Sequence, residues 1–282
     1  MAFIDRIRAC SRFDRSAFVP FRVVGTEVGL IRPGFARTLA AYRDVFHVTD
    51  DGVDLSDRHP SVEARTAAVD DVLRQLAERG VIRGWRDEPY PVAADASAPA
   101  LLLMERAALP LFGVRAAGIH VNGFVRDHGS LKMWIGRRSL QKQTAPGKLD
   151  QMVAGGKSAE YSVEQTLIKE AAEEASLPQT LAMQAKPVGA ITYKTELEHG
   201  LRRDVLYIFD LELPPHFIPT PNDDEISEFY SLPIEQVISI VRETDDFKFN
   251  CSLVVIDFLI RHGLIPHAEP DYLSLIKGLH GD

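Results

Sequence analysis

The chain has 282 residues, a net charge of -8 at pH 7 and only two cysteines, Cys10 and Cys251. Two cysteines far apart argue against a disulfide framework and are typical of a reducing compartment, while the negative charge argues against nonspecific nucleic-acid binding. No apolar run approaches the roughly 20 residues of a membrane span, and the N-terminus lacks the apolar core of a signal peptide. We therefore expect a cytoplasmic protein without nucleic-acid or membrane partners, long enough for two modest domains.

The first hundred residues carry the pattern of a separate α/β unit. Short strands are predicted at 21–24 and 28–31, on either side of Gly25. A Pro-Gly pair then opens a helix over 33–42, because proline is favoured at the first helical position. This order of strands and helix predicts a small sheet with at least one helix packed on it.

A second helix follows Ser61, a residue type that caps helix N-termini, and Gly80 lies where that helix should stop. Its apolar stripe is formed by Val69, Val72, Leu73 and Leu76. Residues 92–99 are small, polar and turn-prone, which is typical of a linker or a surface loop. We therefore predict an N-terminal α/β domain over residues 1–100 and a second domain over 101–282.

The second domain carries patterns that predict a mixed sheet with helices on both sides. Strands are predicted at 118–126, 131–137, 190–195 and 204–213, a turn at 127–130, and helices near Pro233 and over 253–261. Residues 138–150 form a basic loop that leads into the most informative part of the chain, residues 155–177, which we call the box segment.

The box segment begins with a double glycine and continues into a helix whose end carries three acids, Glu170, Glu173 and Glu174. At about 100° per residue, acids spaced i, i+3 and i+4 converge on one patch beside the apolar stripe of the helix. Close carboxylates repel one another unless a cation lies among them, and Mg²⁺ binds carboxylates together with phosphate oxygens. The pattern predicts a Mg²⁺ site for a diphosphate, with Mn²⁺ as an alternative metal; the competing interpretation is an ordinary solvated acidic face.

The order of a double glycine, a helix and Lys-Glu-x-x-Glu-Glu resembles the Nudix box of the Nudix hydrolases. Relative to that box, Lys169 replaces an arginine, Ser176 replaces the last glycine, and Tyr161 takes the place of the first glutamate. The three metal-binding positions of the helix are all acidic.

Nearly the whole chain resembles a Nudix subfamily with an extra N-terminal domain, related to the Nudix half of fungal thiamine pyrophosphokinase fusions and to plant Nudix hydrolases of similar layout. The segments that carry this resemblance are 80–88, 118–123, 134–138, 148–156 and 256–263. The resemblance implies a Nudix-type α/β/α sandwich with a mixed sheet, of the α/β (α+β) class. It also implies Mg²⁺-dependent hydrolysis of thiamine diphosphate, or of its oxo and oxy analogues, to the monophosphate and phosphate.

Basic residues around the box segment are candidates for binding the diphosphate, arginine through its bidentate fork and lysine as a point charge. The candidate substrate-binding residues are Arg137, Arg138, Lys142 and Lys148, together with Gly155 and Gly156. As surface residues, the four basic side chains would need no function.

The acidic loop 222–228 is the second source of candidate catalytic residues, because Nudix enzymes often place a further metal ligand or base in a late loop. Glu225 is the first candidate there and Glu228 the second. We predict that Glu170, Glu173 and Glu174 hold the metal, and that Glu173, Glu174 or Glu225 accepts the proton of the attacking water.

Other side chains have both a functional and a structural interpretation. They are the acids Glu196, Glu198 and Asp204, the bases His120 and His199, and the rings of Trp85, Trp134 and Tyr193, which could stack on a pyrimidine or thiazole. A lone histidine is more often structural, and aromatic residues at strand spacing are more often core. Cys251 has apolar neighbours and is predicted to be buried rather than nucleophilic.

Three further functions stay open alongside a small-molecule thiamine substrate. A hydrolase of ADP-ribose, NADH or coenzyme A would use the same metal residues. A Nudix-fold sensor would bind a nucleotide without cleaving it, although all three box acids are present. A prenyl diphosphate isomerase needs a reactive cysteine near the site, and neither Cys10 nor Cys251 lies beside the box segment in sequence. We expect a monomer or a homodimer.

Overall fold

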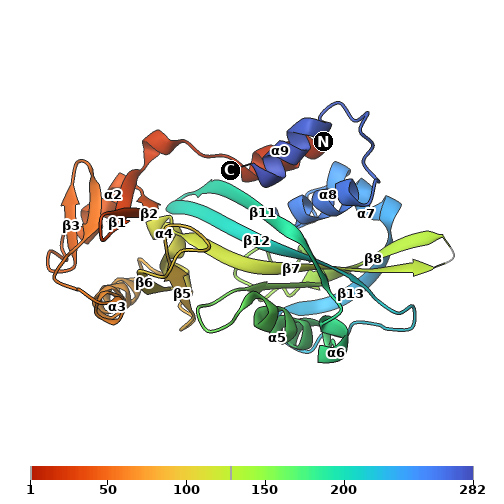
Figure 1. Cartoon of the computed structure of the whole chain (residues 1–282), viewed down its shortest axis with the longest axis horizontal. Coiled ribbons are helices and arrows are strands. Elements are labelled where there is room, and N and C mark those ends of the chain that lie inside the picture. Colours follow the sequence, from red (N-terminus) through yellow and green to blue (C-terminus); the bar gives the residue numbers. More distant parts are fainter. Residues whose placement is uncertain (1, 128, 282) are drawn as a thin grey trace.

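The computed structural model describes residues 2–127 and 129–281, which form a smaller and a larger lobe (Figure 1). The smaller lobe is built on a four-stranded sheet with the strand order β2-β1-β4-β3. Its first elements are β1 (Val19–Val23), β2 (Thr26–Ile31), α2 (Pro33–Leu39), β3 (Phe46–Thr49), β4 (Gly52–Leu55) and α3 (Val62–Glu78). Both predicted strands beside Gly25 are confirmed, whereas α2 ends at Leu39 and not at Tyr42.

Helix α3 forms where the sequence predicted it because both of its ends carry local signals. The Ser61 hydroxyl accepts a hydrogen bond from the Ala64 N–H at 3.1 Å, which satisfies a donor of the first turn. Gly80 follows the helix with a φ of 71°, a conformation that favours glycine. The predicted apolar stripe is buried against the small sheet, as Val69, Val72, Leu73 and Leu76.

Strands β5 (Pro89–Val92) and β6 (Leu102–Glu105) pair antiparallel, so residues 92–99 lie in the connection of a hairpin and form a surface loop. The turn η2 (Arg106–Ala108) and helix α4 (Leu109–Phe112) follow. Apolar side chains of this stretch share one buried cluster with the small sheet, up to Val114. We call residues 19–114 the N-terminal lobe.

The larger sheet is mixed, with the central strand order β11-β12-β7-β8-β13, while β10 pairs with β7 and β9 with β8. Its strands are β7 (Arg115–Asp127), β8 (Ser130–Arg138), β9 (Leu149–Asp150), β10 (Val153–Gly156), β11 (Lys186–Leu197), β12 (Gly200–Glu212) and β13 (Ile226–Pro233). Strands β12 and β7 run parallel. All four predicted strands are present, and His128 of the predicted turn lies outside the described residues.

Helices cover both faces of the larger sheet, as predicted (Figure 1). One face carries α5 (Val163–Ala175) and α6 (Gln179–Ala182), and the other carries α7 (Ile234–Glu243), α8 (Cys251–Arg261) and α9 (Tyr272–His280). Helix α8 is almost wholly buried, and the Phe258 ring packs 5.5 Å from that of Phe124 in the sheet. The predicted α/β (α+β) class is confirmed.

The first helix, α1 (Phe3–Cys10), lies beside the C-terminal helix α9 and not on the small sheet (Figure 1). Phe3 and Ile7 are buried in the core of the larger lobe. Gly278 allows the close approach of α9, because an added Cβ there would lie 2.5 Å from Cγ2 of Ile7. The chain then passes through η1 (Arg15–Ala17) into the N-terminal lobe. The first residues therefore close the core of the larger lobe.

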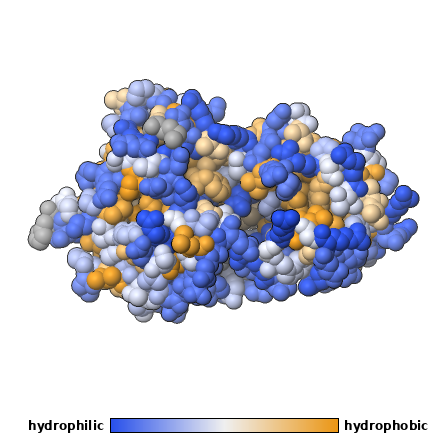
Figure 2. Space-filling view, turned by 180° about the vertical axis from the view of Figure 1, so that it is seen from behind, coloured by the Kyte–Doolittle hydropathy of each residue, from blue (hydrophilic) through white to orange (hydrophobic). Residues whose placement is uncertain are grey.

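The surface seen in Figure 2 is mostly hydrophilic, and its hydrophobic residues lie in small separate groups. Exposed large apolar side chains such as Leu140 and Leu273 come from different elements, and single residues of this kind are normal on a protein surface. Within the described residues, no helix combines the length and the apolar character needed to cross a membrane.

Candidate active site

Helix α5 of the box segment has well-defined ends. Ser162 Oγ accepts a hydrogen bond from the Gln165 N–H at 3.1 Å, and Gln165 Oε1 accepts one from the Ser162 N–H at 2.8 Å. This reciprocal capping box satisfies two donors of the first turn. At the other end Ser176 has a left-handed conformation, with a φ of 51°, where the resembled box has glycine. The helix therefore stops directly after its acids.

The three acids of α5 lie in different surroundings. Glu174 is only 2% exposed, and its Oε2 accepts a hydrogen bond from the Ala154 N–H at 2.7 Å. Burial raises the pKa of Glu174 well above its usual value and also raises the pKa of Glu170. Glu173 is half-exposed, and the Lys169 ammonium lies 2.6 Å from its carboxylate and 3.2 Å from that of Glu170. The site therefore disfavours negative charge on Glu170 and Glu174 unless a cation joins them.

Both glycines before α5 are required by the close approach of neighbouring side chains. An added Cβ on Gly155 would lie 2.2 Å from Cδ of Glu170, and one on Gly156 would lie 2.0 Å from the Tyr90 hydroxyl oxygen. Neither glycine has a positive φ, so space and not backbone conformation excludes a side chain here. The glycine pair thus places bare backbone beside a box acid and beside a residue of the N-terminal lobe.

Glu225 precedes β13 and comes close to the box acids in space. Its carboxylate forms an ion pair with Lys142, and although burial opposes ionisation, this pair lowers the pKa of Glu225. The negative charge of Glu225 in turn contributes to the raised pKa values of Glu170 and Glu174. The fold therefore brings the acidic loop 222–228 close enough to helix α5 for the charge of Glu225 to affect the ionisation of Glu170 and Glu174.

A pocket of about 300 Å³ opens beside this group, between the two lobes. Gly155, Gly156 and Glu225 belong to its lining. Its basic lining residues are Arg83, Arg86, Arg106, Arg138, Lys142, Arg202, Arg203 and Lys248, and its acidic ones are Asp204 and Glu225. Basic residues outnumber acids by eight to two in this lining, in a protein whose net charge is -8, so the pocket attracts anions.

Comparison with known proteins assigns this arrangement to a family. Residues 116–251 match the NUDIX domain, and residues 2–116 match a domain of unknown function (DUF4743). The chain is 43% identical to Nudix hydrolase 24, chloroplastic, of Arabidopsis thaliana over 99% of this chain and 78% of that protein. It is 40% identical to Nudix hydrolase 20, chloroplastic, of the same plant over 98% of this chain and 77% of the relative. The chain belongs to the Nudix hydrolases.

As a Nudix hydrolase the protein acts on a diphosphate bond. It is also similar to the solved NUDIX domain of Shewanella oneidensis NrtR complexed with ADP ribose, with a TM-score of 0.42 and 15% identity over 55% of this chain and 91% of that chain. The predicted domain boundary at residue 100 stays a prediction.

The expected cytoplasmic location is wrong, because both plant relatives are named chloroplastic. The expectation rested on the small number of cysteines and on the missing signal-peptide core. Few cysteines indicate a reducing compartment in general, and they do not distinguish one such compartment from another.

Two of the four basic residues predicted to bind substrate are engaged outside the pocket of this Nudix hydrolase. Arg137 donates to the Tyr230 hydroxyl at 3.0 Å and to the Gly147 carbonyl at 2.9 Å. Lys148 donates to the Asp245 carbonyl at 2.6 Å. Neither belongs to the pocket lining, and their substrate role stays a prediction.

The other two basic residues line the pocket but already have acidic partners. Arg138 is buried, donates to Asp150 at 2.7 Å, and uses its remaining nitrogens on backbone carbonyls of the basic loop, chiefly that of Thr144. Lys142 is paired with Glu225. Arg138 therefore contributes positive charge to the pocket, while its donors are committed to the protein.

The remaining acidic candidates divide between the pocket and the surface. Asp204 lines the pocket and accepts a hydrogen bond from the Tyr193 hydroxyl. Glu196 pairs instead with Arg32 at 2.8 Å, and the exposed residues Glu198 and His199 lie 3.5 Å apart. Glu228 pairs with Arg137 at 3.2 Å.

The aromatic candidates of the sequence are not part of the pocket lining, whereas Tyr90 and Arg106 of the N-terminal lobe are. Trp85 donates to Asp87 at 2.7 Å, and Trp134 packs on the core beneath α5. Sequence reasoning missed Tyr90 because prolines flank it on both sides within its short strand, and missed Arg106 because no motif surrounds it.

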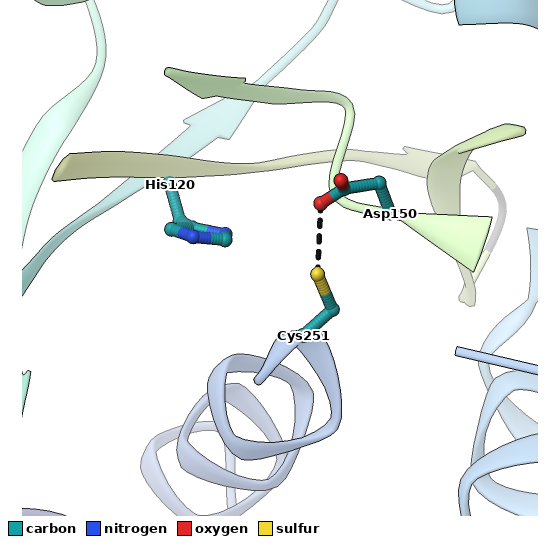
Figure 3. A group of neighbouring side chains, drawn as sticks. All are labelled: His120, Asp150 and Cys251. Atoms are coloured by element: carbon teal, nitrogen blue, oxygen red, sulfur yellow. Dashed lines mark hydrogen bonds between the residues drawn. The ribbon is translucent and has the colours of Figure 1, made fainter. Parts of the chain in front are cut away.

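His120, Asp150 and Cys251 form a buried cluster next to the pocket (Figure 3). Their potential ligand atoms all lie within 4.8 Å of one another. The Cys251 thiol donates to Asp150 at 2.8 Å, and His120 Nδ1 lies 2.7 Å from Gln151 Oε1. Burial lowers the pKa of His120 to about 4, so its ring is neutral near pH 7.

This cluster suits a metal ion poorly. Asp150 already pairs with Arg138 at 2.7 Å and with Lys248 at 3.2 Å, and two cations beside it repel a third. Burial raises the pKa of the Cys251 thiol well above its usual value, so it stays protonated. Cys251 is thus buried, as predicted. The fold nevertheless brings it near the pocket, which the sequence distance had not indicated.

The box acids and Glu225 offer ligand types that suit a hard divalent cation better, although among the described residues only the His120 cluster brings its ligand atoms within 4.8 Å of one another. They offer only carboxylate oxygens, which Mg²⁺ and Mn²⁺ prefer. The charge of Glu170 contributes to the raised pKa of Glu174, and the charges of Glu173 and Glu225 contribute to the raised pKa of Glu170, which is the repulsion a bound cation would relieve. We therefore expect the metal to bind among these acids and not at the His120 cluster.

Proposed function

We propose that this Nudix hydrolase is a magnesium-dependent diphosphatase acting on thiamine diphosphate or its oxothiamine and oxythiamine analogues. The products would be the monophosphate and phosphate. Support for the diphosphatase part comes from a pocket rich in basic residues whose lining includes Glu225 and the glycine pair. Glu170 packs against Gly155 of that lining, and Glu174 accepts a hydrogen bond from the Ala154 N–H. The thiamine part rests on the resemblance to Nudix proteins related to thiamine pyrophosphokinases.

The residues have separate roles in this proposal. Glu170 and Glu174 would hold the metal, joined by Glu173 once its carboxylate leaves Lys169. Bound magnesium would neutralise phosphate oxygens and lower the pKa of the attacking water. Glu173, Glu174 and Glu225 are the candidate proton acceptors, and Glu225 is the one that lines the pocket directly.

The charge of the pocket predicts an order among the thiamine compounds. Thiamine and oxythiamine carry a cationic thiazolium ring, whereas the oxidised ring of oxothiamine is neutral. Eight basic residues in the lining repel a cationic ring. Oxothiamine diphosphate is therefore expected to have the lowest KM of the three.

The same excess of basic residues favours a second candidate function. ADP-ribose, NADH and coenzyme A carry no ring cation, and coenzyme A has a third phosphate that could use the additional arginines. A hydrolase of such a nucleoside diphosphate would employ the same acids and differ in its organic ligand.

The test is product release from thiamine, oxothiamine and oxythiamine diphosphates, ADP-ribose, NADH and coenzyme A with magnesium. Glu174→Gln serves as the blank, and Glu78→Gln, at the exposed end of α3, is the matched control. Magnesium-dependent monophosphate from the thiamine compounds, lost only in the blank, supports the proposal. Turnover of only ADP-ribose, NADH or coenzyme A would contradict the proposed thiamine substrate. Tight binding of a panel compound without its turnover would indicate a sensor.

A further inference from the structure

The hairpin of the N-terminal lobe packs directly on the glycine loop of the box segment. The Ala159 N–H donates to the Pro89 carbonyl at 2.8 Å. An added Cβ on Gly156 would lie not only against the Tyr90 hydroxyl but also 3.2 Å from Cζ of Arg106. Arg106 is therefore held against the backbone that leads into the box helix, although it is distant from that helix in sequence.

Contacts within its own lobe hold Arg106 in this place. Its Nη1 donates to Glu88 Oε2 at 2.8 Å, and its guanidinium carbon lies 5.9 Å from the centre of the Tyr90 ring. Among the described residues, Nε and Nη2 of Arg106 have no hydrogen-bond partner, and the side chain is 41% exposed. A guanidinium that is held in place and keeps two nitrogens free to donate is suited to bind the oxygens of a phosphate.

Two other basic residues of the pocket, Arg138 and Lys142, are less available to an anion. Arg138 donates to Asp150 and to backbone carbonyls, and Lys142 is paired with Glu225. Binding a phosphate through either would first require breaking an existing ion pair. Arg106 needs no such exchange, because its contact with Glu88 uses a single nitrogen.

We propose that Arg106 binds the diphosphate group of the substrate through Nε and Nη2, beside the Gly155-Gly156 loop. The N-terminal lobe thereby supplies a substrate-binding residue to the active site, in addition to enclosing one side of the pocket. The inference rests on the proposed diphosphatase function, which identifies the ligand as an organic diphosphate. It applies equally to a thiamine diphosphate and to a nucleoside diphosphate. It does not depend on turnover, because the contact is made on binding.

The test measures the affinity of the full chain for methylenediphosphonate, a diphosphate analogue that resists hydrolysis, by calorimetry with magnesium. Arg106→Ala is expected to weaken binding by about tenfold or more, because one charge-assisted contact is lost. Arg106→Lys keeps the charge without the fork and should lose roughly threefold. Arg58→Ala is the matched control, since Arg58 is an exposed arginine of the same lobe, paired with Asp44 outside the pocket.

Each result decides for or against the inference. Equal affinity of the wild type and Arg106→Ala overturns it, as does a wild type that does not bind the analogue. Weakened binding in the variant without turnover of any compound leaves the inference standing and removes the proposed function. If thermal unfolding shows that Arg106→Ala does not fold, Arg106→Lys decides, and unchanged affinity in that variant overturns the inference.

Discussion

Glu174 of helix α5 accepts a hydrogen bond from the backbone N–H of Ala154 in strand β10, at 2.7 Å. This contact ties the box helix to the strand that ends in the glycine pair. It also holds a carboxyl group at 2% exposure close to other acids. Without a cation, this place disfavours the ionised carboxylate of Glu174, and a bound cation would make the ionised form favourable. Functional sites often carry such a cost in stability.

Glu174→Gln is expected to stabilise the metal-free protein and to abolish activity. The amide removes a carboxyl group whose ionisation burial opposes, while its oxygen still accepts the hydrogen bond from Ala154. In EDTA the Tm should rise by roughly 2–4 °C, the shift that about 1 kcal/mol produces in a chain of this size. Magnesium should raise the Tm of the wild type and not of the variant. A lower Tm of the variant in EDTA would contradict this account.

Gly155→Ala should reduce turnover by about tenfold or more with little effect on the fold elsewhere. The added methyl would lie 2.2 Å from Cδ of Glu170 and would displace that carboxylate, and small misplacements of reacting groups are costly. Gly34→Ala is the matched control, because its nearest neighbour would be 3.9 Å away. Steady-state kinetics with the preferred substrate of the panel measure both, and wild-type turnover of Gly155→Ala would refute the role of Glu170.

Cys251→Ser is expected to keep activity within about threefold, because the hydroxyl can replace the thiol as donor to Asp150. In the native protein neither cysteine should react with a thiol reagent at pH 8, since burial raises the pKa of Cys10 to about 12 and that of Cys251 well above its usual value. Labelling before and after denaturation checks this. Loss of nearly all activity in the serine variant would instead favour a cysteine-dependent reaction such as isomerisation.

Asp210 should make the protein sensitive to acid. Burial opposes its ionisation, but hydrogen bonds from His262, Arg261 and Asn122 lower its pKa to about 2. A pKa below that of the unfolded chain stabilises the fold above about pH 4, and this contribution, roughly 2 kcal/mol, is lost as the pH falls toward 2. Urea unfolding at pH 7 and pH 3 should show a smaller acid loss in Asp210→Asn than in the wild type. Asp50→Asn, at an exposed site, should behave like the wild type.

Features that depend on neighbouring residues were predictable. Helix α3 lies between its Ser61 cap and Gly80, because capping and helix termination are local interactions. The helix that carries Glu170 and Glu174 also forms over the predicted residues, since helical spacing is set within a few turns. The hairpin of β5 and β6 was not predicted because two prolines interrupt its first strand, and strand β13 was not predicted because it pairs with β8, which is distant in sequence.

By itself, the sequence determined the fold class, the helix that presents the acids and the resemblance to Nudix hydrolases. Only the tertiary structure decided which charges meet at the pocket. Lys142 pairs with Glu225 there and Arg106 reaches the glycine loop, while Lys148, closer to the box segment in sequence than either, is bound elsewhere. The physical reason is that helix formation and capping act over a few residues, whereas the neighbours of a charge are set by how distant segments pack.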